Sequence, residues 1–420
     1  MKRLFLLTVS ILASVTLSAL QPDALEQLKS DPRKAYGNDY PYPTPSQRLT
    51  KAPKGYKAFY ISHYGRHGSR YFWNDSLYPY IDSLLRTAEE NGILTAEGRA
   101  FRDKFMEVER ELNIGMGELT QLGWEQHQGI AARMYGNFPD VFRKGGNVNA
   151  VSSLSVRCMI SMSAFCQELV QCNPELEIRE EASRFTMNRV VPADKKNPEY
   201  RHFDEPEPKF KQSGKKLPWE KEVDSRILAR IFTDPGKLPM ERGKAVNKLK
   251  ELYRSLPNIG REGMMGGIVT DEDMVANWEN SNLSSFRYVF SRHLLVIPIL
   301  EDILLQAQSV IDGRSADVAS LRFGHDSYVG PLSVLMGLDG ADGDPEDPAE
   351  VKNVYRNWDT CMASNIQIVF YRKGRDSSDI LVKFLLNENE VTVPLKTDIF
   401  PYYRWEDVRE FYNGRCSQGR

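Results

Sequence analysis

The stretch KAFYISHYGRHGSR, Lys57–Arg70, joins an apolar run to a short loop that holds two glycines, two arginines and a histidine. Its first part, Lys57–Ser62, is rich in aromatic and apolar residues and predicts a buried β-strand. Charged groups at the end of a buried strand must be compensated by whatever they bind. The loop therefore predicts a binding site for a negatively charged ligand.

Two further segments repeat this order of apolar strand, polar loop and helix. The second strand is Val148–Ser152, and the loop and helix after it carry Arg157. The third is Val318–Phe323, and the loop GHDS after it carries His325 and Asp326. Strands that alternate with helices are typical of crossover connections in a parallel sheet. We therefore expect an α/β fold with a mostly parallel central sheet flanked by helices.

The rest of the chain divides into a leader, a lead-in and one large domain. Residues 1–20 have the layout of a secretory signal peptide, with Lys2 and Arg3 before a short apolar run, and this layout predicts a secreted or periplasmic protein. That run is too short to span a membrane. Residues 21–54 are polar and contain several prolines, which predicts an extended lead-in. We expect one domain at 55–420.

Within that domain, two helix-rich ranges are expected to form insertions that cover the site. They lie at about 76–134 and 184–313, where Thr120 and Asp271 are expected helix N-caps and 285–313 has a continuous helical pattern. In the second range, 188–222 is rich in lysine, glutamate and proline and is a candidate source of cations for a phosphorylated substrate. Near the C-terminus, SNIQIVFYR and DILVKFLLNENEVTVPL predict antiparallel strands at an edge of the same sheet, with NENE as the turn.

Composition excludes several classes of protein. The chain has 420 residues, of which 41% are hydrophobic and 27% charged, and a net charge of −2. These values are ordinary for a globular protein and argue against a general nucleic-acid partner. The five cysteines leave at least one unpaired, and no cysteine or histidine spacing indicates a metal site. The oligomeric state stays open.

The three loops follow strand ends, and open α/β sheets bind ligands beyond the carboxyl ends of their strands. Crowded guanidinium groups repel one another unless a multiply charged anion lies between them, and their geometry matches phosphate oxygens. A helix N-terminus after the second strand would add positive potential. We therefore expect a small phosphorylated substrate to be bound here. The residues of this predicted site are Arg66, His67, Arg70, Arg157, His325 and Asp326.

A histidine among arginines can also react. The arginines would lower the pKa of His67 and keep the imidazole neutral, so that it could attack phosphorus. Asp326 is the carboxylate in these loops that could protonate the leaving oxygen and later accept a proton from water. The arginines would stabilise charge in the transition state, so no metal or other cofactor is expected.

The motif RHGSR, Arg66–Arg70, together with the distal HD at His325 and Asp326, resembles the histidine acid phosphatases, branch 2 of the histidine phosphatase superfamily. The resemblance covers roughly 57–394, and GPLSVLMGL and NIQIVFYR look closest to the multiple inositol polyphosphate phosphatase and phytase group. It implies a phosphoglycerate mutase-like fold and a hydrolase acting on inositol polyphosphates. It also implies that His67 is phosphorylated and Asp326 is the proton donor, with the phosphate bound by four residues: Arg66, Arg70, Arg157 and His325.

Two positions depart from that family pattern. Phe72 stands where the family often has proline, and His-Asp stands where the inositol polyphosphate group often has His-Ala-Glu. The second departure leaves open a general, broad-specificity acid phosphatase. A mutase and a phosphate-binding protein without turnover are further alternatives. We expect His63 and His293 to pack in the core, and we assign no catalytic role to the two other histidines, His127 and His202.

Overall fold

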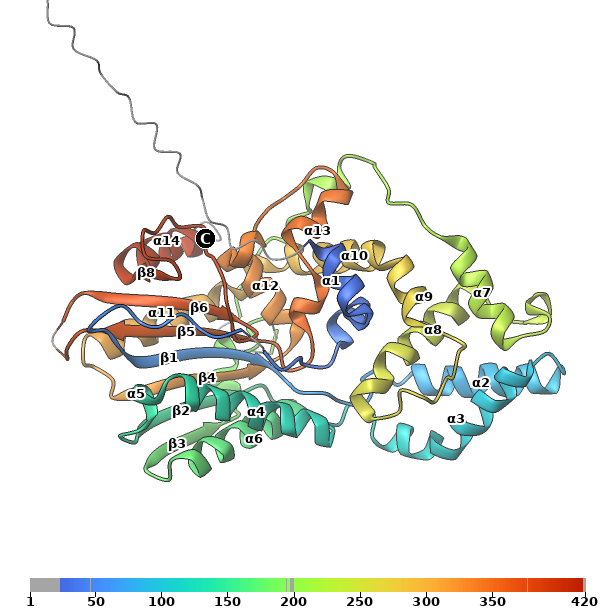
Figure 1. The fold of residues 1–420 in the computed structure, drawn as a ribbon, viewed down its shortest axis with the longest axis horizontal. Helices are drawn as coiled ribbons and strands as arrows, with labels where there is room; N and C mark the ends of the chain where they lie inside the picture. The colour runs from blue at the N-terminus through green and yellow to red at the C-terminus, as the bar shows by residue number, and fades with distance from the viewer. Residues whose placement is uncertain (1–22, 46, 194, 197–199, 376, 418–420) are drawn as a thin grey trace, which may run out of the picture.

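The computed structural model describes residues 23–45, 47–193, 195–196, 200–375 and 377–417, and the predicted signal peptide at 1–20 lies outside them. Over these residues the chain forms one eight-stranded mixed sheet flanked by helices (Figure 1). The strands are β1 (Lys57–Arg66), β2 (Gly146–Ser152), β3 (Leu176–Glu181), β4 (Asp317–Gly324), β5 (Asn365–Arg372), β6 (Ile380–Leu386), β7 (Asn389–Glu390) and β8 (Tyr402–Arg404).

The strand order confirms the predicted α/β architecture. The order is β3-β2-β4-β1-β5-β6-β7, with β8 beside β6. The four strands β3, β2, β4 and β1 are parallel, and β5 to β8 continue the sheet in antiparallel pairs. Strands β1, β2 and β4, which precede the three polar loops, are therefore neighbours. The predicted C-terminal antiparallel strands are also confirmed, and Asn387 and Glu388 form their turn with positive φ.

Helices cover both faces of the sheet. Apolar side chains of α4, α5 and α6 pack on one face, and those of α11, α12 and α14 pack on the other. The helices are α1 (Ala24–Ser30), α2 (Leu77–Glu90), α3 (Ala96–Ile114), α4 (Gln121–Asn137), α5 (Pro139–Phe142), α6 (Val156–Cys172), α7 (Lys221–Ile231), α8 (Arg242–Ser255), α9 (Asp271–Ala276), α10 (Trp278–Ser291), α11 (Ile297–Ile311), α12 (Asp326–Met336), α13 (Val351–Val354) and α14 (Trp405–Ser417).

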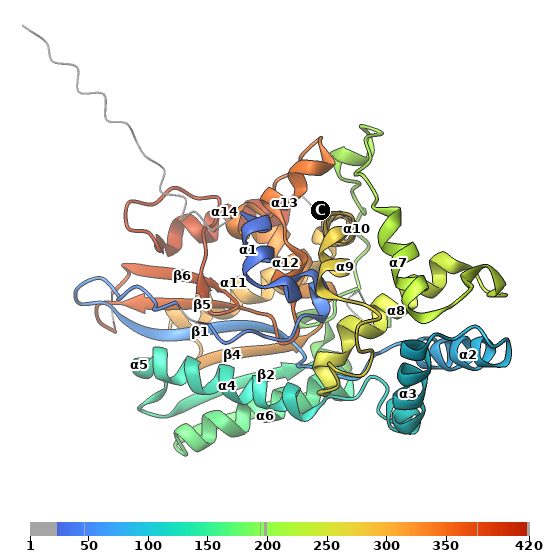
Figure 2. The same cartoon turned by 45° about the vertical axis from the view of Figure 1, so that its right-hand side comes forward.

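A second hydrophobic core lies beside the sheet. It is formed by α2, α3, α7, α8 and α9, together with the N-terminal segment, and occupies the right-hand side of Figure 1 and Figure 2. The two ranges expected as insertions therefore divide between two cores, because the apolar faces of α4 and α11 pack on the sheet instead. We propose that the insertions are narrower than 76–134 and 184–313 and consist of α2–α3 and α7–α9.

The predicted extended lead-in is wrong over residues 24–39. This part forms α1 and a 3₁₀ helix, η1 (Pro32–Asp39). Each begins at an aspartate side chain that accepts a hydrogen bond from the helix backbone: Asp23 from Leu25 and Asp31 from Arg33. Such caps start a helix even where the surrounding residues are polar, and prolines can then occupy the first turn.

One helical stretch in the described part of the chain, His293–Ile311, is long and apolar enough to cross a membrane. In this structure it is a core element, because α11 packs against β1, α12 and α14. The continuous helical pattern at 285–313 is interrupted at 292–296. Pro298 lies in the first turn of α11, where its missing N–H costs no helical hydrogen bond.

Candidate active site

The register of the sheet brings the three polar loops together. Arg66 is paired with Gly324 at the ends of β1 and β4, and Ser152 at the end of β2 is paired with Phe323. The amide of His67 continues the ladder and donates to the Gly324 carbonyl at 3.0 Å. The loops that carry His67, Arg157 and His325 therefore leave one edge of the sheet side by side.

A cavity of about 680 Å³ opens at this edge. It lies between the strand ends and the helices α8 and α10. Five of the six predicted site residues line it: His67, Arg70, Arg157, His325 and Asp326. Arg66 is completely buried beside the cavity, with its Nη2 3.6 Å from Oδ2 of Asp326. The structure thus brings the whole predicted set together.

The imidazole of His67 is held in one orientation. Its Nδ1 is 2.9 Å from the backbone carbonyl of Gly68. A carbonyl only accepts hydrogen bonds, so Nδ1 carries the proton and Nε2 keeps its lone pair. Burial, followed by the charges of Arg66 and Arg70, holds the pKa of His67 well below its usual value of 6.5. The ring is therefore a neutral base at mildly acidic pH, and its centroid lies 5.6 Å from that of His325.

The arginines of the site present N–H groups that lack acceptors. Nε and Nη2 of Arg66, Nε of Arg70 and Nε of Arg157 are buried and have no hydrogen-bond partner among the described residues. Nη1 of Arg66, in contrast, donates to the carbonyl of Thr360 at 2.7 Å. Buried donors without acceptors are costly unless a ligand accepts from them. These N–H groups fit the oxygens of a phosphate.

Asp326 and His325 lie at the start of α12. Burial raises the pKa of the Asp326 carboxyl, but Arg66, a hydrogen bond from Asn38 and the charge of Arg70 together lower it to about 2. Burial and the charge of Arg157 lower the pKa of His325 to about 4. Nε2 of His325 is 3.3 Å from the hydroxyl of Ser153. Without a bound anion, Asp326 is ionised and both imidazoles are neutral.

The His67 loop rests directly on the N-terminus of α4. A Cβ atom on Gly68 would lie 2.4 Å from the carbonyl oxygen of Gly123, and one on Gly123 would lie 2.2 Å from that of Ser69. The side chain of Gln126 accepts from the Ser69 amide at 2.8 Å and donates to its hydroxyl at 2.9 Å. The segment ELTQLGWEQHQ, at 118–128, therefore supports the loop, with Thr120 as the predicted helix cap.

Several side chains of the cavity were not expected from the sequence. Three of them contact the predicted site residues or one another: Asn38 and Asp39 of η1, and Arg254 at the end of α8. Asp39 is buried, and its carboxylate lies 3.8 Å from Nη2 of Arg70 and accepts from Nε of Arg254 at 2.8 Å. No local pattern marks these residues, because their partners are distant along the chain. The short stretch GND, 37–39, is a turn signal and was the one available hint.

The remaining histidines lie away from the cavity. His63 and His127 are buried beside the rings of Phe165 and Phe323, which confirms that His63 packs in the core. His293 was expected in the core, but it is only half-buried against Phe290 and lines a different cavity. His202 is exposed.

The lysine-rich segment at 188–222 contributes no side chain to the described lining of the cavity. Lysines of this segment pair with nearby carboxylates instead, for example Lys215 with Asp347 at 2.8 Å and Lys211 with Glu207 at 2.9 Å. The supply of cations by this segment therefore stays a prediction without a contact that supports it.

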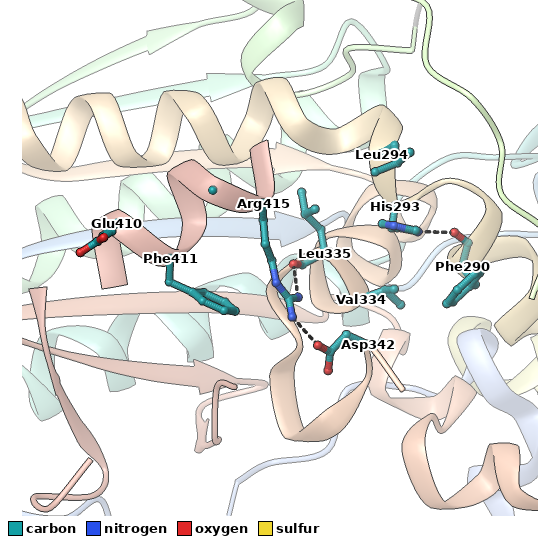
Figure 3. A pocket seen from close by; sticks show the side chains of 10 residues that line it. Phe290, His293, Leu294, Val334, Leu335, Asp342, Glu410, Phe411 and Arg415 are labelled. Atoms are coloured by element: carbon teal, nitrogen blue, oxygen red, sulfur yellow. Dashed lines mark hydrogen bonds and ion pairs between the residues drawn. The ribbon is translucent and has the colours of Figure 1, made fainter. Parts of the chain in front are cut away.

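A second cavity, of about 570 Å³, lies at the opposite end of α12 (Figure 3). Its arginine, Arg415, is paired with Asp342 and donates to the Leu335 carbonyl at 2.7 Å, so this cavity has no comparable set of free guanidinium donors. Among the residues that the structure describes, no group of three or more His, Cys, Asp or Glu side chains is placed to hold a metal ion. The first cavity is therefore the candidate active site.

Comparison with known proteins gives structural relatives only. No family model and no curated protein matches the chain. The multiple inositol polyphosphate phosphatase of Bifidobacterium longum, in complex with phosphate, is 20% identical with a TM-score of 0.72, covering 92% of this chain and 100% of that chain. The structure of the same enzyme in complex with inositol hexasulfate is 18% identical with a TM-score of 0.71, covering 90% of this chain and 97% of that chain.

The phytase from D. castellii is 13% identical with a TM-score of 0.67, covering 92% of this chain and 86% of that chain. At these identities the likeness establishes the fold, over almost the whole length of both proteins. The fold expected from the resemblance is thus confirmed: the chain has the fold of the histidine acid phosphatases.

Proposed function

We propose that this protein is a phosphomonoester hydrolase that acts through a phosphohistidine intermediate, with inositol polyphosphates as its substrates. The observation that carries the proposal is the set of buried guanidinium N–H groups without acceptors, which surrounds an imidazole whose Nε2 is free. An enzyme rather than a passive phosphate binder is favoured because Asp326 lies in the same cavity, where it can exchange a proton with the leaving group.

The reaction has two steps. In the first, Nε2 of His67 attacks phosphorus, the bond from phosphorus to the ester oxygen breaks, and Asp326 gives its proton to that oxygen. In the second, water attacks phosphorus, the N–P bond breaks with its electron pair returning to Nε2, and Asp326 accepts the proton of the water. Arg66, Arg70 and Arg157, with His325, bind the equatorial oxygens and stabilise their charge.

Binding of the substrate phosphate also allows Asp326 to become protonated, which it must be to act as an acid. In the free site, the positive charge of Arg66 and Arg70 holds the pKa of Asp326 down. A dianion offsets that charge, so the pKa of Asp326 rises when substrate binds. Substrate binding and protonation of the donor are therefore coupled, without a metal ion in the scheme.

Inositol polyphosphates are proposed because the fold and the cavity agree with them. Solved structures of this fold include a phosphatase in complex with inositol hexasulfate and a phytase. Arg254, opposite the His67 loop, adds a fourth guanidinium that could contact a second phosphate. The alternative is a broad-specificity acid phosphatase, and it is favoured by the absence of any lysine from the described residues that line the cavity.

We also propose that the protein is exported, on the signal-peptide layout of residues 1–20.

A panel of phosphorylated substrates tests the proposed function. Phosphate release from p-nitrophenyl phosphate and from inositol hexakisphosphate is measured in the presence of a chelator, for the wild-type protein and for His67→Ala. We expect turnover of both compounds by the wild-type protein and none by His67→Ala. Higher kcat/KM for inositol hexakisphosphate supports the proposed substrate class. No release of phosphate by the wild-type protein would contradict the enzyme proposal.

A further inference from the structure

A side chain outside the predicted set contacts the carboxylate of Asp326. Asn38 lies near the end of η1, and its Nδ2 is 2.6 Å from Oδ2 of Asp326. The backbone carbonyl of Asn38 accepts a hydrogen bond from Nη1 of Arg66. Asn38 therefore joins the expected proton donor to an arginine of the phosphate site, although it is distant from both along the chain.

The segment around Asn38 is fixed from both sides of the cavity. The carbonyl of Asp39 accepts from Nδ2 of Asn258 at 2.7 Å, next to the second core. The carbonyl of Tyr40 accepts from the amide of Met362 at 2.9 Å, next to the sheet. The side chain of Asn38 thus approaches Asp326 from a backbone that is held in place.

Two neutral donors reach Asp326: the side-chain amide of Asn38 at Oδ2, and the backbone amide of Ser327, which donates to Oδ1 at 3.0 Å. Of the two, only Asn38 can be removed by a side-chain substitution. Charged and titratable groups surround Asp326: Arg66, Arg70, His325, Tyr288 and Tyr355 interact with it, and His67, Asp39, Arg157 and Arg254 line the same cavity. A phosphoryl group on His67 would offset the charge of the arginines, but it would not offset a hydrogen bond from a neutral amide. In the phosphoenzyme, the Asn38 bond is therefore a remaining interaction that favours ionised Asp326.

We propose that Asn38 is a positioning residue that keeps Asp326 ionised and aimed as the base for hydrolysis of the phosphohistidine. The inference rests on the proposed function, in which Asp326 is an acid in the first step and a base in the second. In that second step, the oxygen of water bonds to phosphorus, the N–P bond breaks with its electrons returning to Nε2, and Asp326 takes the proton of the water. Asn38→Ala should then slow the second step and spare the first.

The first test needs no turnover. The protein is labelled with ¹³C at aspartate carboxyl carbons, and the Asp326 signal, identified by its loss in Asp326→Asn, is titrated by NMR. We expect Asn38→Ala to raise the pKa of Asp326 by about one unit, the equivalent of a lost hydrogen bond to a charged group. Asn38→Asp keeps the size and shape of the side chain but places a second negative charge beside Asp326, so the pKa of Asp326 should rise further. An unchanged pKa in both variants would overturn the proposal.

The matched control is Tyr40→Phe. Tyr40 belongs to the same segment, and its hydroxyl donates to Asp31 at 2.6 Å without contacting Asp326. This variant loosens the segment but keeps the Asn38 amide, so the pKa of Asp326 should match that of the wild-type protein. An equal shift in Tyr40→Phe would mean that the segment, rather than the Asn38 amide, controls Asp326, and would overturn the assignment.

The second test separates the two steps with p-nitrophenyl phosphate. We expect Asn38→Ala to lower kcat about tenfold, to leave kcat/KM within about threefold, and to show a burst of one nitrophenolate per chain. The acidic limb of kcat should also move to higher pH. Equal losses in kcat and kcat/KM without a burst would overturn the proposal. If the wild-type protein shows no turnover, the proposed function fails, and the NMR titration still decides whether Asn38 acts on Asp326.

Discussion

At the scale of single residues, the position of Asp326 leads to a test based on the leaving group. An alkyl alcohol needs a proton as it leaves, whereas nitrophenol needs little, so a proton donor matters for the first and hardly for the second. We expect Asp326→Asn to lower kcat/KM for an alkyl phosphate about 10²- to 10⁴-fold, and that for p-nitrophenyl phosphate by less than about tenfold. Because kcat/KM reports only the steps through phosphorylation, equal losses for both substrates would exclude Asp326 as the donor.

Arg254 provides a second test at this scale. It lines the cavity outside the expected binding residues, and Asp39 holds only its Nε. We expect Arg254→Ala to lower kcat/KM for inositol hexakisphosphate about tenfold or more, the value of one charge-assisted contact, and to leave that for p-nitrophenyl phosphate within about twofold. Steady-state kinetics on both substrates measure the difference. A similar loss on both would mean that Arg254 acts through Asp39 and Arg70 instead.

The sequence was sufficient to predict that the six residues share one site, because each lies at or just beyond the end of a strand, and parallel strands end at one edge of the sheet. It was not sufficient for Asn38, Asp39 and Arg254. Their contacts to Asp326, Arg70 and one another join segments far apart in the chain, and neither periodicity nor a short motif reports such contacts. The close contacts of Gly68 and Gly123 between the His67 loop and α4 could not be predicted from the sequence either, since each depends on how closely two backbone segments approach.

At the scale of elements, the contact between the His67 loop and α4 can be tested with one extra methyl group. In Gly123→Ala, the Cβ atom would lie 2.2 Å from the Ser69 carbonyl oxygen, which belongs to the loop backbone and cannot rotate away. We expect a loss of about 1–3 kcal/mol in the free energy of unfolding, the typical cost of overpacking, and a fall in kcat of at least about tenfold. Chemical denaturation and kinetics measure the two effects.

The same helix supplies the control. Gly136 lies in α4, and a Cβ atom there would meet nothing within 4 Å. Gly136→Ala should therefore stabilise the protein by about 0.5–1 kcal/mol and leave activity unchanged. If Gly123→Ala behaved like Gly136→Ala, close packing of the loop on α4 would not be what holds His67 in place.

The N-terminal boundaries of the helices show how well local sequence patterns predict capping residues. Thr120 was expected to cap α4, and its hydroxyl accepts from the Gly123 amide as predicted. For α9, Asp271 was expected as the cap, but Thr270 occupies that position and forms a capping box with Asp273. Both residues are good caps, and the reciprocal pair of hydrogen bonds decides between them. Segment 24–39 was expected to be extended because it belongs to the polar, proline-containing stretch 21–54, and that composition does not reveal the caps at Asp23 and Asp31.

At the scale of the whole molecule, buried histidines make stability depend on pH. Burial lowers the pKa of His63 and of His127 to about 3, from 6.5 in the unfolded chain. Both are neutral when folded, so their contribution is fully present above pH 6.5 and is lost as the pH falls from 6.5 towards 3. From pH 8 to pH 5, we expect the two to lower the free energy of unfolding by about 4 kcal/mol.

Chemical denaturation at several pH values measures this loss, with His127→Leu as the test variant. Neither ring nitrogen of His127 forms a hydrogen bond of normal geometry among the described residues, although the ring interacts with the backbone of Arg66. Leucine therefore removes a titrating group at little cost in hydrogen bonding. We expect the variant to lose about 2 kcal/mol less than the wild-type protein between pH 8 and pH 5. An unchanged pH dependence would mean that folding does not shift the pKa of His127.

The architecture was predictable at this scale because three strands separated by helices restrict the sheet to a few parallel arrangements. Which helices cover the sheet and which form the second core was not predictable, since α3 and α4 both bury part of their surface and follow one another in the chain. Only the packing of whole faces distinguishes them.

The central claim is that His67 forms a covalent bond to the phosphoryl group. Rapid acid-free quenching of the wild-type protein with ³²P-labelled substrate, followed by peptide mapping, measures this directly. We expect up to one alkali-stable, acid-labile phosphate per chain on the peptide that contains His67, and none in His67→Ala. Turnover by the wild-type protein without label on that peptide, or with label on another residue, would contradict the account.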